Sequence, residues 1–463
     1  MAMMATMAMM AVTSSARRTF IVWAFVCPAA AALFGSWPRA AVAQPGPPPA
    51  AGAAQPAAAP APPAGRADGC ITCHRNANDD RIKAPAALFS DADIHRESGF
   101  TCVDCHGGDG TSDIAERAHA PASLFRGRPR GQAVVTTCAR CHSDAELMRR
   151  FSPRQRVDQA AEYATSVHGK RLAAGDTGVA TCASCHGAHG IRTVRDAKSP
   201  VYPTNVAATC AVCHASASHM QAYKQPNGSP LPTNQLADYQ KSVHFVAMTK
   251  GEDLSAPTCN DCHGNHGAAP PGVGAVANVC GTCHAAFAQK FEMSVHREVF
   301  DRGCVECHGN HAVARPSDAL LGTGAGSICG MCHEGADDKG VQAATAMRTG
   351  IDSLKARLDA SSALIARVRN AGMEVSEQEL AIAEARTRLT LARTEMHATN
   401  PALLDPILGE GVKFADAVDA AGDRSLAELQ FRRRGLAVSL VAILLVVVAL
   451  ALKVRQIDRR QAE

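Results

Sequence analysis

The C-terminal third of the chain carries the clearest periodic pattern of apolar positions. Two stripes recur at the spacing of one helix face. They consist of Ile351, Leu354, Leu358, Ile365 and Val368, and of Ile382, Ala385, Leu389, Ala392 and Met396. Gly372 lies between the stripes, and Ser376 with Glu379 has the spacing of a capping box. The pattern predicts an antiparallel helical hairpin within residues 340–430, whose second helix ends at Asn400-Pro401.

A second apolar pattern, without any periodicity, covers residues 435–452. Arg432, Arg433 and Arg434 precede this run, and Lys453 and Arg455 follow it. Eighteen apolar residues with basic flanks predict a membrane-spanning helix, because long basic side chains can reach the lipid headgroups. The alternative is the buried core helix of a soluble protein, which the flanking charges oppose. We expect residues 453–463 to form a cytoplasmic tail.

The N-terminus has the features of a secretory signal. Arg17 and Arg18 precede an apolar run over 20–34, and Ala41-Val-Ala43 follows it. This order predicts a signal peptide over residues 1–43, with an uncleaved N-terminal anchor as the alternative. Residues 44–68 are mostly Pro, Ala, Gly and Gln, which predicts a linker that cannot bury a core.

The composition indicates that protein side chains alone do not fill the core. Hydrophobic residues make up 46% of the 463 residues, but Phe, Trp and Tyr together make up only 4%. Aromatic side chains normally dominate a core of this size. The formal net charge is +4, and no basic cluster adjoins stacking aromatics. The sequence therefore favours no nucleic-acid partner.

The cysteines form a repeated motif. Of 19 cysteines, 18 fall into nine CxxCH motifs, and Cys27 alone lies outside them. We number the motifs 1 to 9, and they span 70–74, 102–106, 138–142, 182–186, 210–214, 259–263, 280–284, 304–308 and 329–333. Their cysteines are Cys70, Cys73, Cys102, Cys105, Cys138, Cys141, Cys182, Cys185, Cys210, Cys213, Cys259, Cys262, Cys280, Cys283, Cys304, Cys307, Cys329 and Cys332.

This motif is typical of covalent haem attachment. Two thiols at this spacing can each form a thioether with a vinyl group of one haem, and the adjacent histidine supplies an axial ligand to the iron. Zinc and disulfide sites are the alternatives for a CxxC pair. Neither requires a histidine directly after the second cysteine, yet all nine motifs have one. The sequence therefore predicts nine covalent haem c groups over residues 69–335.

Internal repeats organise this region. Three full modules contain Ser-Val-His, then CxxCHGxH, then CxxCH, and they begin at Ser166, Ser242 and Ser294. A degenerate module begins at Asp93-Ile-His95, and its first motif, CVDCHGGDG, lacks the second histidine. Four modules of two motifs, together with motif 1, account for all nine.

The histidine count predicts two imidazole ligands for each iron. The motif histidines are His74, His106, His142, His186, His214, His263, His284, His308 and His333. The other ten are His95, His119, His168, His189, His219, His244, His266, His296, His311 and His397. Counting by module assigns eight of these as second ligands, including His119 as the substitute in the degenerate module, and the ninth is His219 or His397. Met220, Met248 and Met331 are alternative ligands, although packing roles suit them better.

The histidine three residues past a motif has a further implication. Its motif histidine already occupies one face of its own haem, so we expect His189, His266 and His311 to reach a neighbouring haem. Such cross-ligation would hold two porphyrins close together.

These motifs resemble those of the multihaem c-type cytochromes of anaerobic respiratory chains. The resemblance covers residues 70–333 and implies bis-histidine haems in a chain. It also implies electron passage between a membrane-embedded, quinone-reactive partner and a periplasmic or more distant acceptor. In the quinol-oxidising tetrahaem type the anchor is N-terminal, whereas the expected anchor here is C-terminal, so this chain departs from that pattern.

We therefore expect a mainly α protein with a large share of irregular loops. It would comprise a haem-cored repeat domain, the helical hairpin and the C-terminal transmembrane helix, with the haem domain on the periplasmic side of the inner membrane. Its expected function is electron transfer, without a catalytic residue. The alternative is a multihaem oxidoreductase that reduces a small nitrogen or sulfur compound at one open iron, although none of the nine motifs is altered.

Overall fold

The computed structural model describes residues 68–225, 227–271 and 276–462. These residues are mainly helical, and their only bridge between extended segments joins Lys224 to Pro230. The expected signal peptide (1–43) and the expected linker (44–68), apart from Asp68, lie outside the described residues, as does Cys27.

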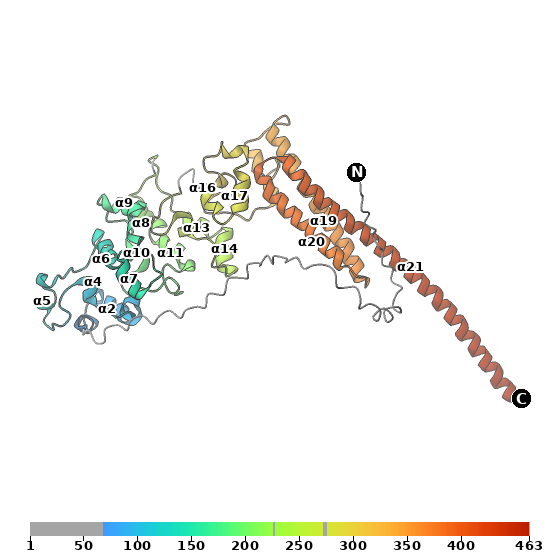
Figure 1. The fold of residues 1–463 in the computed structure, drawn as a ribbon, viewed down its shortest axis with the longest axis horizontal. Helices are drawn as coiled ribbons and strands as arrows, with labels where there is room; N and C mark the ends of the chain where they lie inside the picture. Colours follow the sequence, from blue (N-terminus) through green and yellow to red (C-terminus); the bar gives the residue numbers. More distant parts are fainter. Residues whose placement is uncertain (1–67, 226, 272–275, 463) are drawn as a thin grey trace, which may run out of the picture. The chain divides into compact units, whose positions relative to one another are not determined.

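The motif-bearing region consists of short helices joined by irregular segments (Figure 1). The helices that carry motif residues are α1 (Gly69–Arg75), α4 (Cys102–His106), α6 (Gln132–His142), α10 (Cys182–His186), α11 (Pro203–His214), α15 (Cys259–His263), α16 (Val276–Gly281), α18 (Cys304–His308) and η5 (Cys329–Met331). The other helices are α2 (Asp80–Ala92), α3 (Ile94–Glu97), α5 (Ala115–Ala118), η1 (Pro121–Ser123), α7 (Ala145–Phe151), α8 (Gln159–Thr165), α9 (Val167–Ala173), α12 (Ala217–Met220), α13 (Gln235–Tyr239), α14 (Val243–Lys250), α17 (Ala285–Phe291), η3 (Val295–Arg297) and η4 (Asp318–Leu320).

The first motif of each module forms a helix of five residues, and nearby residues determine where this helix starts and ends. In α15, the Thr258 N–H donates to the carboxylate of Asp261 at 2.8 Å, which satisfies a backbone group at the helix start. Gly264 follows His263 with φ of +84°, a left-handed conformation that glycine adopts without strain. The glycine of the HGxH sequence therefore ends the helix and turns the chain toward the second histidine.

The Ser-Val-His segments also begin helices. Ser166, Ser242 and Ser294 are the N-cap residues of α9, α14 and η3, and each accepts a backbone N–H with its side chain. Asp93 has the same position before α3. All four are buried, with at most 5% of their surface exposed. The serine of the motif is thus a buried helix cap that fixes the histidine two residues later.

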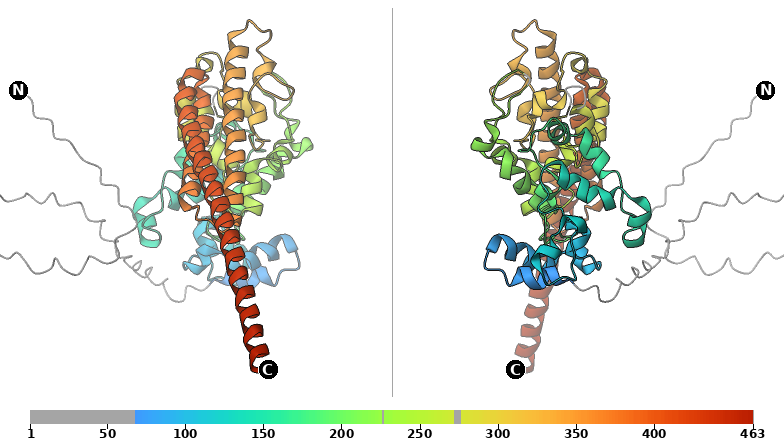
Figure 2. Two further views of the ribbon diagram at one scale, coloured as in Figure 1. Left: turned by 90° about the vertical axis from the view of Figure 1, so that its right-hand side faces the viewer. Right: turned by 90° about the vertical axis from the view of Figure 1, so that its left-hand side faces the viewer.

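The C-terminal part is a bundle of three helices, α19 (Lys339–Asn370), α20 (Ser376–Glu395) and α21 (Pro401–Ala462), with the short η6 (Met396–Ala398) before α21. Figure 2 shows the three helices side by side. Both expected stripes face the bundle core, and α21 adds Leu404, Leu408 and Val418. Gly411 and Gly422 face Leu354 and Leu364 so closely that a Cβ atom would come within 2.8 Å of their side chains.

The third helix departs from the expected hairpin. Asn400-Pro401 was expected to end the second helix, and α20 does end before it, but Pro401 is also the first residue of α21. Proline suits the first helical position because its missing N–H would have no partner there and its φ angle is already helical. The two predicted helices are therefore packed against a third, which continues without interruption into the apolar segment.

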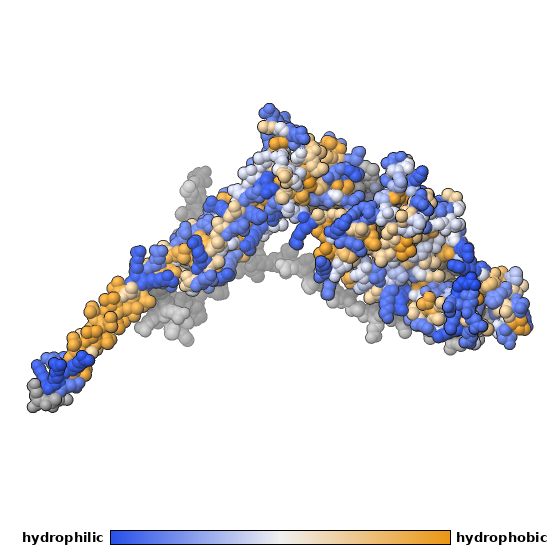
Figure 3. Space-filling view, turned by 180° about the vertical axis from the view of Figure 1, so that it is seen from behind, coloured by the Kyte–Doolittle hydropathy of each residue, from blue (hydrophilic) through white to orange (hydrophobic). Residues whose placement is uncertain are grey.

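Among the described residues, α21 is the one helix that is long and apolar enough to cross a membrane. Its most apolar window of 18 residues has a mean hydropathy of 3.0, and none of it is buried. Figure 3 shows this segment as an apolar band with polar residues at both ends. Eighteen helical residues span about 27 Å, close to the hydrocarbon thickness of a bilayer. The helix is therefore compatible with a single-pass membrane anchor.

Candidate metal centres

Every motif histidine faces one other histidine across a short gap. The pairs are His74–His119, His106–His189, His142–His95, His186–His266, His214–His168, His263–His311, His284–His244, His308–His397 and His333–His296. The ring centres in these pairs lie 5.9–6.3 Å apart. Two imidazoles on opposite sides of one metal ion, each with its nitrogen about 2 Å from the metal, have ring centres roughly 6 Å apart.

The histidine pairs suit a metal that brings its own remaining ligands. Within residues 68–225, 227–271 and 276–462, no group of three or more His, Cys, Asp or Glu side chains converges to hold a metal ion. A structural zinc site needs four such ligands. A haem iron has four porphyrin nitrogens and needs only two axial ligands from the protein. The nine pairs therefore fit haem and do not fit zinc.

The cysteines are in the state that thioether formation requires. All 18 described cysteines are free thiols, so no CxxC pair is closed as a disulfide. In seven motifs both cysteines lie in one helix next to the motif histidine, and in motifs 7 and 9 the second cysteine, Cys283 or Cys332, follows within two residues of the helix end. These thiols can therefore attach a haem whose iron the adjacent histidine binds.

Eight of the nine pairs fall into two classes that alternate along the chain from motif 2 to motif 9, whereas the motif 1 pair, His74–His119, is tilted at 32° and takes its second histidine from between motifs 2 and 3. For motifs 2, 4, 6 and 8 the ring planes are nearly parallel, at 8°, 13°, 17° and 23°. For motifs 3, 5, 7 and 9 they are tilted, at 89°, 65°, 37° and 63°. The tilted class takes its second histidine from the Ser-Val-His position of the same module. The parallel class takes it from outside the module.

The parallel class links neighbouring modules. His189, His266 and His311 follow motifs 4, 6 and 8, yet they face the histidines of motifs 2, 4 and 6. The geometry therefore does not support the expected assignment, in which each module supplies both second ligands for its own two irons. Each HGxH histidine instead faces a motif histidine of the preceding module. The expectation that it serves a neighbouring haem agrees with this arrangement.

Backbone hydrogen bonds accompany each of these links. The N–H of Ile94 donates to the carbonyl of Ile191 at 2.8 Å, that of Val167 to Ala268 at 3.0 Å, and that of Val243 to Val313 at 2.9 Å. Each acceptor lies two residues after the linking histidine. The start of one Ser-Val-His helix is thus bonded to the HGxH loop of the next module.

The helical bundle takes the place of a further module. In the last module, the hydroxyl groups of Ser294 and Thr399 lie 2.8 Å apart, and Thr399 is two residues after His397. His397 lies on η6 and faces His308 of motif 8 at 6.1 Å. Lys290 of α17 forms an ion pair with Glu395 at 2.8 Å beside it. His397 therefore occupies the position that an HGxH histidine has elsewhere.

The tenth histidine has another environment. His219 packs its ring against Tyr223 at 5.7 Å, and no ring contact joins it to a motif histidine in the described part of the chain. Of the alternative methionine ligands, Met220 and Met248 are buried, while Met331 is 77% exposed. The geometry therefore favours His397 over His219 as the ninth second ligand, and it favours histidine over methionine.

The nine motifs follow one another in space as they do in the sequence. In four pairs of first cysteines the partner thiol has the largest effect on the pKa: Cys70 with Cys102, Cys138 with Cys182, Cys210 with Cys259, and Cys280 with Cys304. Burial is the main cause that raises the pKa of Cys105, Cys185, Cys262 and Cys307, and a thiol of the next motif adds to the effect at each of them: Cys141, Cys213, Cys283 and Cys329. Thiol pairs of the two kinds alternate, so each motif lies near the next one from motif 1 to motif 9.

Burial favours the protonation state that binds metal. Desolvation lowers the pKa of His186, His308 and His397 below the ordinary value, and a nearby histidine adds to the effect at His186 and His308. An imidazole must be neutral to coordinate a metal ion. Burial therefore favours the neutral, coordinating form of these three imidazoles near neutral pH.

The second ring nitrogen of several histidines has an oxygen partner. Nδ1 of His106, His263 and His397 lies 2.8–3.2 Å from the backbone carbonyls of Gly127, Ala269 and Thr394. Carboxylates take this role at two positions, where Asp93 lies 3.0 Å from His95 and Asp338 lies 3.0 Å from His333. Such partners fix the ring orientation and leave the other nitrogen for the metal.

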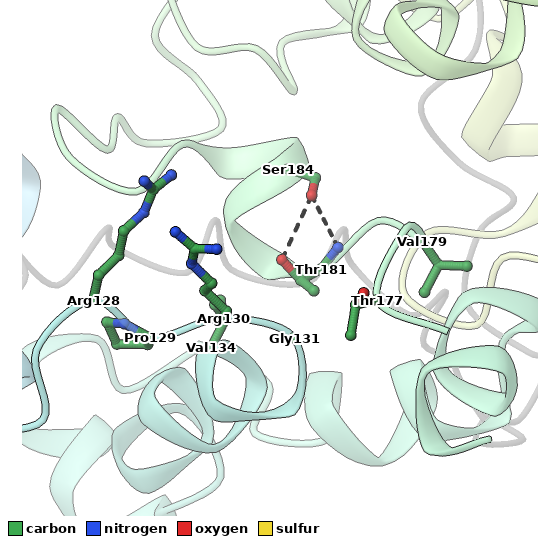
Figure 4. A pocket seen from close by; sticks show the side chains of 9 residues that line it. All are labelled: Arg128, Pro129, Arg130, Gly131, Val134, Thr177, Val179, Thr181 and Ser184. Atoms are coloured by element: carbon green, nitrogen blue, oxygen red, sulfur yellow. Dashed lines mark hydrogen bonds between the residues drawn. The ribbon is translucent and has the colours of Figure 1, made fainter. Parts of the chain in front are cut away.

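A surface hollow of about 410 Å³ lies beside motif 4. Its lining includes Arg128, Arg130, Thr177, Thr181 and Ser184. Figure 4 shows both arginines on the irregular segment that leads into α6. The Thr181 N–H donates to the Ser184 hydroxyl at 3.0 Å. The lining contains no motif cysteine and no histidine. A molecule bound there would not face a histidine pair, so the hollow does not favour the reductase alternative.

Sequence reasoning missed three carboxylates beside the paired histidines, namely Asp93, Asp338 and Glu162, the last at 3.6 Å from Nδ1 of His266. Asp93 was visible as the residue that replaces serine in the degenerate module, which is a usable signal. Asp338 carried none, because only the fold brings the N-cap of α19 to motif 9. No protein-family model, no curated protein and no solved structure matches this chain. A functional assignment therefore rests on the paired histidines and on the order of the cysteine motifs.

Proposed function

We propose that this chain is a multihaem c-type cytochrome that binds nine covalent haem c groups and transfers electrons along them. One observation carries the proposal: all nine CxxCH histidines face a second histidine at the spacing of two axial ligands of one iron. When bound, haem c supplies a one-electron Fe(III)/Fe(II) couple. The residues of the chain attach it, orient it and close both faces of its iron.

The distribution of the protein core supports the same proposal. Both hydrophobic clusters of the described residues consist of bundle residues, to which the motif region contributes only Leu321 and, in part, Cys329. Val295 and Val299, on either side of His296, are 73% and 70% exposed. A region of this length normally buries an apolar core of its own. Nine porphyrins between the paired histidines would provide that core and cover these side chains.

The order of the motifs supports conduction over catalysis. Cysteines of neighbouring motifs lie near one another from motif 1 to motif 9, which would bring neighbouring porphyrins close together. A reductase needs an iron with one open position. Since every motif histidine is faced by another histidine, no observation favours that second function, and we propose no catalytic residue.

The helical bundle and the apolar segment suggest how the protein is held. We place the haem region in the periplasm and the tail after Leu452 in the cytoplasm, since haem is attached to c-type cytochromes outside the cytoplasm. About 50 Å of α21 separates Pro401, next to His397, from the apolar segment at a rise of about 1.5 Å per residue. Motifs 8 and 9 therefore require a redox partner, such as a membrane-embedded quinone-reactive subunit, to exchange electrons with the membrane.

The haem count is the direct test of this proposal. Intact-protein mass spectrometry of the exported, mature chain is expected to show nine haem additions on a polypeptide that begins after Ala43. The variant Cys210→Ser with Cys213→Ser is expected to lose one of them, because both thioether bonds at motif 5 are removed. Fewer than nine additions in fully matured wild-type protein would contradict the proposal.

Truncation tests the anchor. Removal of residues 432–463 is expected to release a soluble haem protein into the periplasm, because the apolar segment is then missing. Removal of residues 454–463 alone is the matched control and is expected to leave the protein in the membrane. Fractionation of washed membranes measures both. Tight membrane association of the longer truncation would show that another part of the chain also attaches it.

A further inference from the structure

One ligand histidine has a buried carboxylate as its partner. Asp93 is 2% exposed and accepts three hydrogen bonds. They come from Nδ1 of His95 at 3.0 Å, from the backbone N–H of His95 at 2.9 Å and from the backbone N–H of Ile191 at 3.0 Å. His95 faces His142, so the carboxylate lies directly behind the second ligand of motif 3.

The equivalent position is uncharged in the other modules. Ser166 and Ser242 use their hydroxyl groups for backbone bonds, to Gly169 N and Phe245 N respectively. The hydroxyl of Ser294 lies 3.4 Å from Nδ1 of His296, a longer contact from a neutral group. Motif 3 is therefore the one of the four tilted pairs with an anion at this position.

In the described residues, no Lys or Arg side chain pairs with the carboxylate of Asp93. Its ion pair is with His95 itself. Two other carboxylates, Asp338 and Glu162, lie beside ligand histidines, and both are about one third exposed. Asp338 also binds the N–H groups of Gly340 and Val341 at the start of α19, and Glu162, at 3.6 Å from Nδ1 of His266, pairs with Arg156. Water weakens the effect of both charges on the histidines, and the helix terminus and Arg156 weaken it further. Burial strengthens the effect of Asp93 on His95.

A carboxylate on the second nitrogen makes an imidazole a more basic ligand. A more basic ligand favours Fe(III) over Fe(II), so the one-electron reduction potential of that iron falls. We propose, on the basis of the cytochrome function above, that Asp93 makes the motif 3 iron the lowest-potential centre of the nine. Motif 3 lies near motif 2, where Cys141 is close to Cys105, and near motif 4, where Cys138 is close to Cys182. The chain is thereby divided into an outer pair, motifs 1 and 2, and a set of six, motifs 4 to 9, with an uphill electron step between them.

Asp93→Ser tests the inference with the residue that the other modules carry. The full-length protein in detergent is titrated spectroelectrochemically, and the ferric low-spin EPR signals are followed at each potential. We expect the lowest-potential component, about one ninth of the haem absorbance, to move upward while the haem count stays at nine. Asp93→Asn, which keeps a hydrogen-bond acceptor without the charge, is expected to move the same component upward.

The reciprocal variant is Ser294→Asp. It places a carboxylate behind His296 and is expected to move a different component, that of motif 9, downward. Asp338→Asn is the comparison for an exposed carboxylate and is expected to give a smaller upward shift than Asp93→Asn.

The outcomes separate the two proposals. An unchanged lowest component in Asp93→Ser, with nine haems present, would overturn this inference and leave the cytochrome function intact. If Asp93→Ser does not mature, Asp93→Asn and Ser294→Asp decide, and the absence of any shift in both would also overturn it. Fewer than nine haems in the wild-type chain would overturn the cytochrome function itself.

Discussion

Replacement of His397 by alanine is expected to turn about one ninth of the haem population high-spin and able to bind carbon monoxide when reduced. His397 faces His308 at 6.1 Å, so its loss leaves the motif 8 iron with one protein ligand. Cys304 and Cys307 remain, so we expect nine haems to stay attached. Wild-type protein is expected to bind almost no carbon monoxide, because the proposed pairing gives each of the nine irons two histidines.

His219→Ala is the matched control for this experiment. Both residues are histidines outside the motifs, and the sequence alone offered either as the ninth second ligand. His219 packs against Tyr223 instead of facing a motif histidine, so its replacement is expected to leave every iron low-spin. If His219→Ala opens an iron and His397→Ala does not, the bundle contributes no ligand. If wild-type protein already binds about one carbon monoxide per chain tightly, one iron is open and the reductase alternative becomes the better function.

The segment around His397 also attaches the helical bundle to the last module. Lys290 with Glu395 and the hydroxyl contact of Ser294 with Thr399 hold η6 against the last module. Asp318, next to that module, binds Arg393 of α20 through both carboxylate oxygens, at 2.9 and 2.7 Å. A terminal repeat needs a neighbour that covers its open side. The bundle provides this cover, so it completes the row of modules as well as joining it to α21.

The parts of the structure that local chemistry determines were predictable from the sequence. The apolar stripes lie on α19 and α20 and face the core of the bundle, and the exposed apolar run lies within a helix long enough to cross a membrane. The third bundle helix was missed because Pro401 was interpreted as a stop, whereas proline equally suits a helix start. A local pattern cannot distinguish these two roles when both apply at the same residue.

The ligand pairs were predictable as a count but not as contacts. Repetition indicated His168, His244 and His296 as candidate ligands, and it predicted that the HGxH histidines serve another haem. It could not show which haem, because the partner of His189 is His106 in the preceding module. It also could not choose between His219 and His397, since that choice depends on where η6 packs. Contacts between residues so distant in sequence follow from the fold and not from spacing.

Replacement of His266 by alanine is expected to open the iron of motif 4, in the preceding module, and to leave that of its own motif 6 closed. His266 lies three residues past His263, so spacing alone would associate it with motif 6. Its ring faces His186 instead, at 6.2 Å and 13°, while His263 faces His311 at 6.0 Å. One high-spin iron and one bound carbon monoxide per chain are expected, with nine haems retained through their thioether bonds.

Double variants identify which iron has opened. If His186 and His266 bind one iron, His186→Ala with His266→Ala disturbs only that iron, and carbon monoxide binding stays at one per chain. His263→Ala with His266→Ala disturbs two irons under this pairing and is expected to bind two. The opposite result, two for the first variant and one for the second, would assign His266 to its own motif and reject the links between modules. Single replacements of His186 and His263 complete the comparison, and because each is expected to open one iron, departures from simple addition report shared ligation alone.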